Sequence, residues 1–288
     1  MAVAGFIGLG NIGQPMAKRL LANTDGLVVF DVVAEAADKL VAKGARRAES
    51  LADMATSAEV VSVMVRDDAQ VRDVTSGLLE HARPGLVIAI HSTIRAATAI
   101  ELEQVAAASG VMIADAPVSG GAMGAHQGTL AALFGGSEEA LELCRPVFAH
   151  WASLVVHLGP VGSGTNAKLA RNLLHFIAFT AVGEAQRLAE AAGIDIMKLG
   201  DIVRHTDKIT GGPGAIMLRT VAGEQQPGDD WYETFANVAS LGEKDLALAL
   251  ALGDELGVDL PLGHLAFDRL APELGVPHSE HYDTKDVT

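Results

Sequence analysis

The chain has 288 residues, of which 49% are hydrophobic and 20% are charged, and its formal net charge is −15. This charge argues against nucleic acid or an anionic membrane as a partner, and no apolar run reaches the roughly 18 residues that a membrane span needs. The single cysteine excludes an intramolecular disulfide framework, so we expect a reducing, cytoplasmic setting.

The N-terminal stretch VAGFIGLGNIGQPMAKRLLA predicts a short strand, a glycine-rich turn and a helix that begins near Ile12. Gly8, Gly10 and Gly13 form a G-x-G-x-x-G pattern, which allows a tight turn, a close approach of a pyrophosphate and close packing of helix on strand. The pattern alone is weak, because a glycine-rich turn without a ligand is a real alternative. We expect a strand here and no signal peptide, because no basic segment precedes it.

A second apolar strand, GLVVFD, ends at Asp31. A carboxylate at this position can accept hydrogen bonds from ribose hydroxyls and repel a 2′-phosphate, which favours NAD over NADP. The alternative is a helix N-cap or a turn residue. Further strands are predicted within residues 59–65, 85–93 and 110–118, separated by amphipathic segments. Together these runs predict parallel strands covered by helices, that is, an α/β domain of the Rossmann type.

Residues 162–193 predict one long helix with a charged residue near its start. Lys168, Asn172 and His175 share a face, and residues 173–182 are apolar nearly all the way round, which predicts a buried helix. A lysine in an apolar cleft has a lowered pKa, so that it can act as a general acid or base. A structural salt bridge is the alternative for this residue.

Four motifs in order carry a resemblance: GFIGLGNIGQPMAKRL, DAPVSGGAMGAHQGTL, GPVGSGTNAKLARNLL and LGEKDLALAL. They resemble the β-hydroxyacid dehydrogenases, of which 3-hydroxyisobutyrate dehydrogenase is the nearest type, within the 6-phosphogluconate dehydrogenase superfamily. The resemblance implies an NAD-binding Rossmann-like domain, residues 1–161, and an all-helical substrate and dimerisation domain, residues 162–288. It also implies a homodimer or homotetramer.

The resemblance also implies roles for single residues. Lys168 matches the catalytic lysine and Asn172 the amide beside it. The substrate-binding residues implied are Ser119, Gly120 and Gly121, which would hold a carboxylate, and Lys244. Lys244 is also among the cofactor-binding residues, which are Gly8, Gly10, Asn11, Ile12, Gly13, Asp31, Met64, Val65, Ser92, Thr93 and Lys244.

The chain departs from the family pattern at three places. Arg171 replaces an asparagine but points away from Asn172, and His91 stands where an acid is common. The segment 203–220 does not match the usual substrate-domain loop. We expect a loop at residues 204–208, whose cations could meet a second polar group of the substrate, although a solvated turn is the alternative.

His175 stands where decarboxylating relatives place a glutamate, so we expect a reaction that stops at hydride transfer. This histidine either lines the substrate pocket or is a neutral core residue. Lys244 is flanked by two acids, which leaves an exposed ion pair as its alternative. The ten histidines do not cluster at ligand spacings, so no metal is predicted.

The sequence thus predicts an NAD-dependent oxidoreductase that interconverts a small 3-hydroxy acid and its semialdehyde or keto acid. An imine reductase has the same architecture and normally lacks the lysine. A non-enzymatic NAD-binding protein would need no proton-transfer group. Lys168 therefore argues against both.

Overall fold

The computed structural model describes residues 3–220, 222–280 and 282. The chain divides into two compact units after Asn172, within a single long helix. In the described part of the chain no helix is long and apolar enough to cross a membrane.

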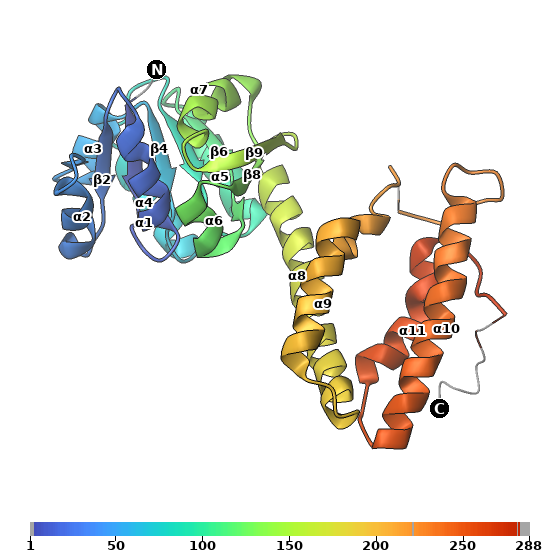
Figure 1. Ribbon diagram of the computed structural model, residues 1–288. Coiled ribbons are helices and arrows are strands. Elements are labelled where there is room, and N and C mark those ends of the chain that lie inside the picture. The colour runs from blue at the N-terminus through green and yellow to red at the C-terminus, as the bar shows by residue number, and fades with distance from the viewer. Residues whose placement is uncertain (1–2, 221, 281, 283–288) are drawn as a thin grey trace. The chain divides into compact units, whose positions relative to one another are not determined.

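The first unit is built on a six-stranded parallel sheet with the strand order β3-β2-β1-β4-β5-β6 (Figure 1). The strands are β1 (Ala4–Ile7), β2 (Leu27–Phe30), β3 (Arg46–Arg47), β4 (Val60–Val63), β5 (Val87–Ile90) and β6 (Met112–Asp115). The expected strands are therefore present, and the predicted parallel α/β architecture is confirmed.

Successive residues of each strand point to opposite faces of this sheet, and each face carries its own core. Phe6 and Val29 belong to one core, with α1, α2, α6 and α7, whereas Ile7 and Val28 belong to the other, with α3, α4 and α5. The helices are α1 (Gly13–Arg19), α2 (Ala34–Val41), α3 (Leu51–Ser57), α4 (Asp68–Leu79), α5 (Ala96–Ala107), α6 (Gly121–Gln127) and α7 (Glu138–Phe148), and the 3₁₀ turn η1 (Leu20–Ala22) follows α1. Cys144, on α7, is fully buried in the first of these cores.

A second sheet of three strands, in the order β7-β8-β9, completes this unit. Its members are β7 (Val118–Ser119), β8 (Leu130–Phe134) and β9 (Ala152–His157). The strand expected within residues 110–118 is thus split into β6 and β7. Pro117 lies at the break, where its missing N–H and fixed φ end the ladder.

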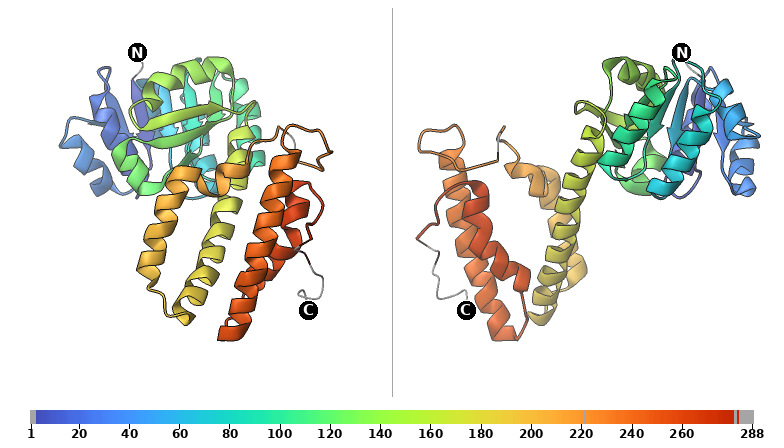
Figure 2. Two further views of the ribbon diagram at one scale, coloured as in Figure 1. Left: turned by 45° about the vertical axis from the view of Figure 1, so that its right-hand side comes forward. Right: turned by 180° about the vertical axis from the view of Figure 1, so that it is seen from behind.

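The described residues of the second unit form helices joined by turns and loops, with no strand among them, as predicted (Figure 2). It contains the later part of α8 (Ser163–Ala191), then α9 (Ile196–Thr210), the 3₁₀ turn η2 (Gly212–Ile216), α10 (Tyr232–Leu256) and α11 (Pro261–Leu274). Helices α10 and α11 lie side by side and share two small cores, centred on Phe235 and Phe267.

The prediction that residues 173–182 are buried is wrong for the single chain. Leu173 is 64% exposed, Phe176 59% and Phe179 58%. An apolar sequence shows that a surface favours being covered, but it does not show that the same chain covers it.

The predicted loop at residues 204–208 is also wrong, because these residues lie inside α9. Asp195 caps the start of that helix by accepting a hydrogen bond from the Met197 N–H. Gly211, at φ +90, ends it in the left-handed conformation typical of a C-cap. The glycines that suggested mobility therefore mark a helix end.

Candidate active site

The order of connection reverses between β1 and β4, and sheets of this kind bind ligands in a crevice outside the carboxyl ends of such strands. The glycine turn follows β1, Met64 and Val65 follow β4, and Ser92 and Thr93 follow β5. Because parallel strands end at the same edge, the fold brings the predicted cofactor residues of the first unit to one edge of the sheet.

The three glycines of the turn serve different purposes. A Cβ on Gly8 would lie 2.1 Å from the Met64 carbonyl oxygen, and one on Gly13 would lie 2.0 Å from the Gly8 carbonyl oxygen. A Cβ on Gly10 would meet nothing within 4 Å. Gly8 and Gly13 therefore permit close packing, whereas Gly10 leaves an open backbone face that suits a pyrophosphate. Asn11 is exposed beside it, and Ile12 is the N-cap of α1.

Asp31 follows β2 and faces the glycine turn. Its Oδ2 accepts a hydrogen bond from the Leu9 N–H at 2.6 Å, and its Oδ1 accepts one from the Val33 N–H at 2.8 Å. The N-cap of α2 is Val33, so Asp31 is not that cap, but its hydrogen bond from the Val33 N–H, two residues on, is a turn contact of the kind considered as its alternative. Its contact with Leu9 also fixes the carboxylate beside the predicted dinucleotide turn.

Ser92 differs from Thr93 in what its hydroxyl does. The Ser92 Oγ accepts a hydrogen bond from the Val65 N–H at 2.9 Å and donates one to the Val65 carbonyl oxygen at 2.7 Å. Thr93 is exposed. Ser92 therefore positions Val65 at the crevice, and Thr93 is the member of the pair whose side chain is accessible.

His91 is buried behind these residues and joins three strand ends. Its Nδ1 lies 2.8 Å from the Ala116 carbonyl oxygen, which only accepts, so Nδ1 carries the proton and Nε2 accepts from the Ser62 hydroxyl at 3.0 Å. Burial lowers the pKa of His91 to about 4. The residue that stands where an acid is common is therefore a neutral structural link.

Lys168 is buried within the first turns of α8, and only 9% of the residue is exposed. Its Nζ donates a hydrogen bond to the Val118 carbonyl oxygen at 2.6 Å. Burial lowers the pKa of this amine, and the nearby Arg171 cation lowers it further. Within the described residues Lys168 has no carboxylate partner, which removes the salt bridge considered for it.

The predicted carboxylate anchor lies directly beside this amine. Ser119 follows Val118, the acceptor of the Lys168 hydrogen bond, and is half-buried. Gly120, at φ +125, and Gly121, at φ +62, are exposed and lead into α6. A buried amine, a hydroxyl and an unobstructed backbone turn are thus brought together in one unit.

The remaining predicted site residues are Asn172, His175 and Lys244. Asn172, one turn after Lys168, is half-buried, and its Oδ1 accepts a hydrogen bond from Arg171 at 3.4 Å. The expectation that Arg171 points away from Asn172 is therefore wrong, because its long side chain reaches back to the neighbouring amide. His175 and Lys244 belong to the second unit. The His175 ring centroid lies 4.2 Å from that of Phe179, and Lys244 forms an ion pair with Asp245 at 2.8 Å.

Asp115 is a residue that sequence reasoning missed. It is fully buried at the end of β6, and its two oxygens accept hydrogen bonds from the Gly162 N–H at 2.8 Å and the Thr165 N–H at 2.6 Å. The available signal was an acid within the apolar run GVMIADAPV. No grouping of three or more His, Cys, Asp or Glu side chains suited to a metal occurs in the described part of the chain.

Two protein-family models match the two parts of the chain. Residues 3–159 match the NAD-binding domain of 6-phosphogluconate dehydrogenase, and residues 162–273 match the NAD-binding region of NADP-dependent 3-hydroxyisobutyrate dehydrogenase. An uncharacterized oxidoreductase of Mycobacterium tuberculosis is 50% identical over 286 residues, which cover 98% of this chain and 97% of that one.

Two further relatives have a stated activity. The NAD-dependent L-serine dehydrogenase of Pseudomonas aeruginosa is 36% identical over 273 residues, covering 92% of this chain and 90% of that one. The structure of Mycobacterium tuberculosis 3-hydroxyisobutyrate dehydrogenase with L-serine matches at a TM-score of 0.67 and 32% identity, covering 94% of this chain and 93% of that one. From its two matched domains and these full-length relatives, the chain belongs to the β-hydroxyacid dehydrogenase family of NAD(P)-dependent oxidoreductases, with the 3-hydroxyisobutyrate dehydrogenase type of two-domain architecture.

Proposed function

We propose that this protein is an NAD-dependent dehydrogenase that interconverts a small 3-hydroxy acid and its semialdehyde or keto acid. The observation that carries the proposal is the buried Lys168 amine, which lies beside Ser119 and its following glycines in the same unit as the dinucleotide turn. Each requirement of alcohol oxidation, namely a base, an anchor and a cofactor site, then has a residue to meet it.

Lys168 moves the proton. Alcohol oxidation removes the hydroxyl proton as hydride leaves the carbon, and the lowered pKa of Lys168 makes a neutral amine available as the base. In the reverse direction the ammonium returns the proton. Asn172 holds the substrate hydroxyl beside the amine by a hydrogen bond.

The anchor residues orient the substrate. The Ser119 hydroxyl and the N–H groups of Gly120 and Gly121 bind the substrate carboxylate, which sets the distance from the anchor to the reacting carbon. Lys244 and His175 of the second unit are proposed as further substrate-binding residues. A 3-hydroxy acid such as serine or 3-hydroxyisobutyrate has the carboxylate and hydroxyl spacing that this anchor and base require, and relatives named for these substrates support this class.

The cofactor in this proposal is NAD. The open backbone face at Gly10 holds its pyrophosphate, and the Asp31 carboxylate binds its ribose hydroxyls and disfavours a 2′-phosphate. When bound, the nicotinamide accepts or returns the hydride. Val65, positioned by Ser92, and Thr93 border the nicotinamide end of the crevice.

The active form in this proposal is a homodimer or homotetramer. The apolar residues 173–182 of α8 are exposed in the single chain, and an apolar surface of this kind is typical of a subunit interface.

The test is a Lys168→Ala variant assayed by reduced-nicotinamide absorbance with 3-hydroxyisobutyrate, glycerate, serine and 4-hydroxybutyrate. We expect turnover on the best substrate to fall by about 10² to 10⁴, the range for losing a general acid or base, while NAD affinity changes little. Lys198→Ala, at an exposed position on α9, is the control and should keep full activity. A Lys168→Ala enzyme with more than half of the wild-type rate would remove this lysine from the mechanism.

The second candidate is an imine reductase on the same fold. The buried Lys168 argues against it, and the same absorbance assay with cyclic imines and NADPH separates the two activities. A protein that binds NAD and turns over neither substrate class would instead be a non-enzymatic NAD-binding protein.

A further inference from the structure

Asp115 connects the large sheet, the small sheet and the lysine helix. Its carboxylate accepts hydrogen bonds from Gly162 and Thr165, at the first turn of α8, across 47 and 50 residues of sequence. Its backbone pairs with Gly135, at the end of β8, through hydrogen bonds of 3.0 and 2.8 Å. The carboxylate therefore caps a helix to which it is not adjacent in sequence.

The backbone around Asp115 leaves no room for adjustment. A Cβ on Gly135 would lie 2.4 Å from the Asp115 Oδ1, and one on Gly164 would lie 2.4 Å from the Asp115 carbonyl oxygen. Helix α8 therefore begins in van der Waals contact with β6, and its first turn has a fixed position relative to that strand.

The start of α8 that Asp115 caps also carries the Lys168 amine. Lys168 follows Thr165 by three residues, about 4.5 Å along the helix axis, and so lies on the same face. Its Nζ bonds to the carbonyl oxygen of Val118, three residues after Asp115. Residues 115–118 thus fix the helix start at one end and the amine at the other.

We propose that Asp115 is a positioning residue, which places the Lys168 amine against the substrate by capping α8. This proposal rests on the proposed function of Lys168. At neutral pH the buried carboxylate is costly, since burial raises the pKa of Asp115 against the opposing hydrogen bonds from Thr165 and Gly162. Two N–H donors aimed at two oxygens explain why this position carries an acid rather than an amide, which has one acceptor oxygen.

The test compares Asp115→Asn with Asp68→Asn. Asp68 is the control, because it contacts the start of α5 through a single oxygen, Oδ1, which accepts from the Arg95 N–H at 3.1 Å and from the Thr98 hydroxyl. In Asp115→Asn we expect faster hydrogen exchange at Gly162 and Thr165, a kcat lower by about 10-fold to 10²-fold, and an NAD Kd within about twofold of wild type. Asp68→Asn keeps this acceptor oxygen, so exchange at Arg95 and kcat should both stay unchanged.

A fourth readout separates this proposal from the proposed function. The Lys168 amine is titrated by NMR in the absence of substrate, and in Asp115→Asn its pKa should return toward the ordinary 10.5 as the loosened helix admits water. An unchanged titration and unchanged exchange at Gly162 and Thr165 would overturn the positioning role. A wild-type enzyme inactive on every hydroxy acid, but with the titration shifted in the variant, would contradict the proposed function alone.

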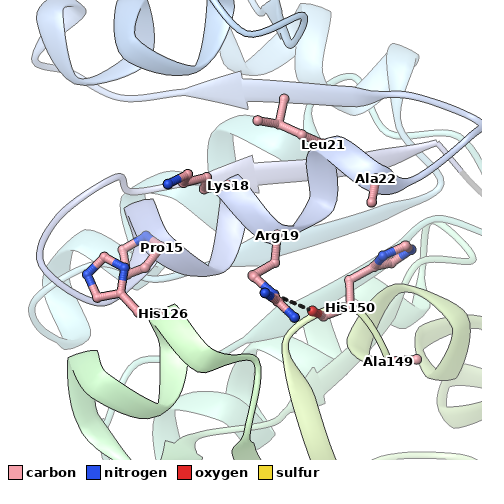
Figure 3. Close-up of a pocket in the computed structure, with 8 residues that line it drawn as sticks. All are labelled: Pro15, Lys18, Arg19, Leu21, Ala22, His126, Ala149 and His150. Atoms are coloured by element: carbon pink, nitrogen blue, oxygen red, sulfur yellow. Dashed lines mark hydrogen bonds between the residues drawn. The ribbon is translucent and has the colours of Figure 1, made fainter.

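A different observation concerns the outer side of α1. A hollow of about 640 Å³ lies between α1, α6 and the turn after α7 (Figure 3), and a second of about 350 Å³ extends from it toward α2. Both are lined by Pro15, Lys18 and His126, so they form one continuous depression, the α1 groove.

The α1 groove is basic in an acidic protein. It is lined by four permanent cations, which are Lys18, Arg19, Lys39 and Lys43, and by the imidazoles of His126 and His150. No Asp or Glu lines either hollow, although the chain has 36 acidic residues against 21 basic ones. Across residues 3–220, 222–280 and 282, none of the four cations forms an ion pair with a carboxylate. The groove thus concentrates positive potential.

Arg19 is held in place within the groove. Its Nε donates a hydrogen bond to the His150 carbonyl oxygen at 3.1 Å (Figure 3). Its guanidinium lies over Gly128, where a Cβ would be 2.5 Å from Nη2. Fixed on two sides by backbone, Arg19 offers its remaining N–H groups without further ordering.

We infer that the α1 groove binds a phosphorylated small molecule. The larger hollow has the volume of small-molecule sites, with Leu21, Ala22 and Ala149 supplying apolar contacts. Arg19 at one end and Lys39 and Lys43 at the other suit a ligand with anionic groups at both ends. Lys18 and Arg19 lie at the end of α1, whereas the dinucleotide turn precedes this helix; the lining of the smaller hollow begins at Gln14, directly after that turn.

The test uses inorganic triphosphate as the probe, titrated calorimetrically into protein already saturated with NAD so that the glycine turn is filled. We expect one site per chain, and a Kd at least about tenfold weaker in Lys18→Glu/Lys43→Glu, since two charge-assisted contacts are lost. Lys198→Glu/Lys208→Glu, exposed on α9, is the matched control with the same charge change and should bind within about twofold of wild type. No binding at millimolar probe, or equal weakening in both variants, would overturn the inference.

Discussion

Arg171 contacts Asn172 and lies near the Lys168 amine. Its cation lowers the pKa of the buried amine, so replacing it with an uncharged residue raises that pKa. Oxidation needs the neutral amine, and kcat should therefore rise with pH through the Lys168 pKa and level off above it. In Arg171→Met we expect the rise of kcat to move to higher pH, with little change in the maximal kcat, as measured by pH–rate profiles. Arg171→Lys keeps the charge, so its kcat should rise over the same pH range as in the wild type. If kcat rises over the same pH range in all three enzymes, Arg171 does not affect the pKa of Lys168.

Asp31 is the residue that we expect to select the cofactor. Its carboxylate is fixed by the Leu9 N–H, so it cannot swing away from a 2′-phosphate without losing that bond. We expect the wild-type kcat/KM to be higher with NAD than with NADP. Asp31→Ala should reduce this ratio, chiefly by weakening the binding of NAD. Steady-state kinetics with both cofactors measure this, and a wild-type preference for NADP would contradict the assignment.

At the scale of elements, several helices begin on carboxylates that are distant in sequence. Asp115 caps α8 across 50 residues, Asp68 contacts the start of α5 across 27, and Glu184 accepts from Leu262 at the start of α11 across 78. Ser50 and Ser137, by contrast, cap α3 and α7 locally. Distant capping ties helices to strands and to one another, and it helps to set where each helix starts.

Helix α8 offers two glycines for testing how tightly its first turn is seated. A Cβ on Gly164 would lie 2.2 Å from the Leu133 carbonyl oxygen, whereas one on Gly183 would find only an Arg187 nitrogen at 3.8 Å. We expect Gly164→Ala to lower the free energy of unfolding by about 1–3 kcal/mol through steric strain. Gly183→Ala should be neutral or raise it by up to about 1 kcal/mol through helix propensity. Urea denaturation followed by circular dichroism compares them, and equal stability of the two variants would contradict the seating of the first turn.

The pattern of apolar runs was sufficient to predict the strands of the large sheet, because buried parallel strands leave a continuous hydrophobic signal. The small sheet was not predicted. Its β7 has two residues, and β9 mixes buried and exposed positions, so neither is distinctive in sequence. Lys168 and the glycine turn could be found because their chemistry is local to a motif. Asp115 could not, because its partners are brought to it only by the fold.

At the scale of the whole molecule, the second unit exposes many large apolar side chains. Besides residues on α8, Ile202 is 60% exposed and Ile209 73% on α9. We expect Phe176→Glu/Phe179→Glu to convert an oligomer to monomers, since two charges would have to be buried in the interface. Light scattering coupled to size-exclusion chromatography measures the mass.

The control for this change is Val105→Glu, which places one charge at a residue 62% exposed on α5 in the first unit. It should leave the mass unchanged. A wild-type protein that is monomeric at micromolar concentration would contradict the proposed oligomer, as would a double variant that assembles like the wild type.

Cys144 is buried on α7 in a core of the first unit, so its reactivity can show when that core opens. It is the chain's single cysteine, and burial raises the pKa of its thiol, so the reactive thiolate is suppressed as well as shielded. A soluble thiol reagent can therefore label the folded chain only during moments when the first unit opens. The labelling rate reports the frequency or population of those openings, and it needs no engineered probe. The same reagent applied to Gly164→Ala or Asp115→Asn would show whether loosening the start of α8 stays local or spreads into the sheet.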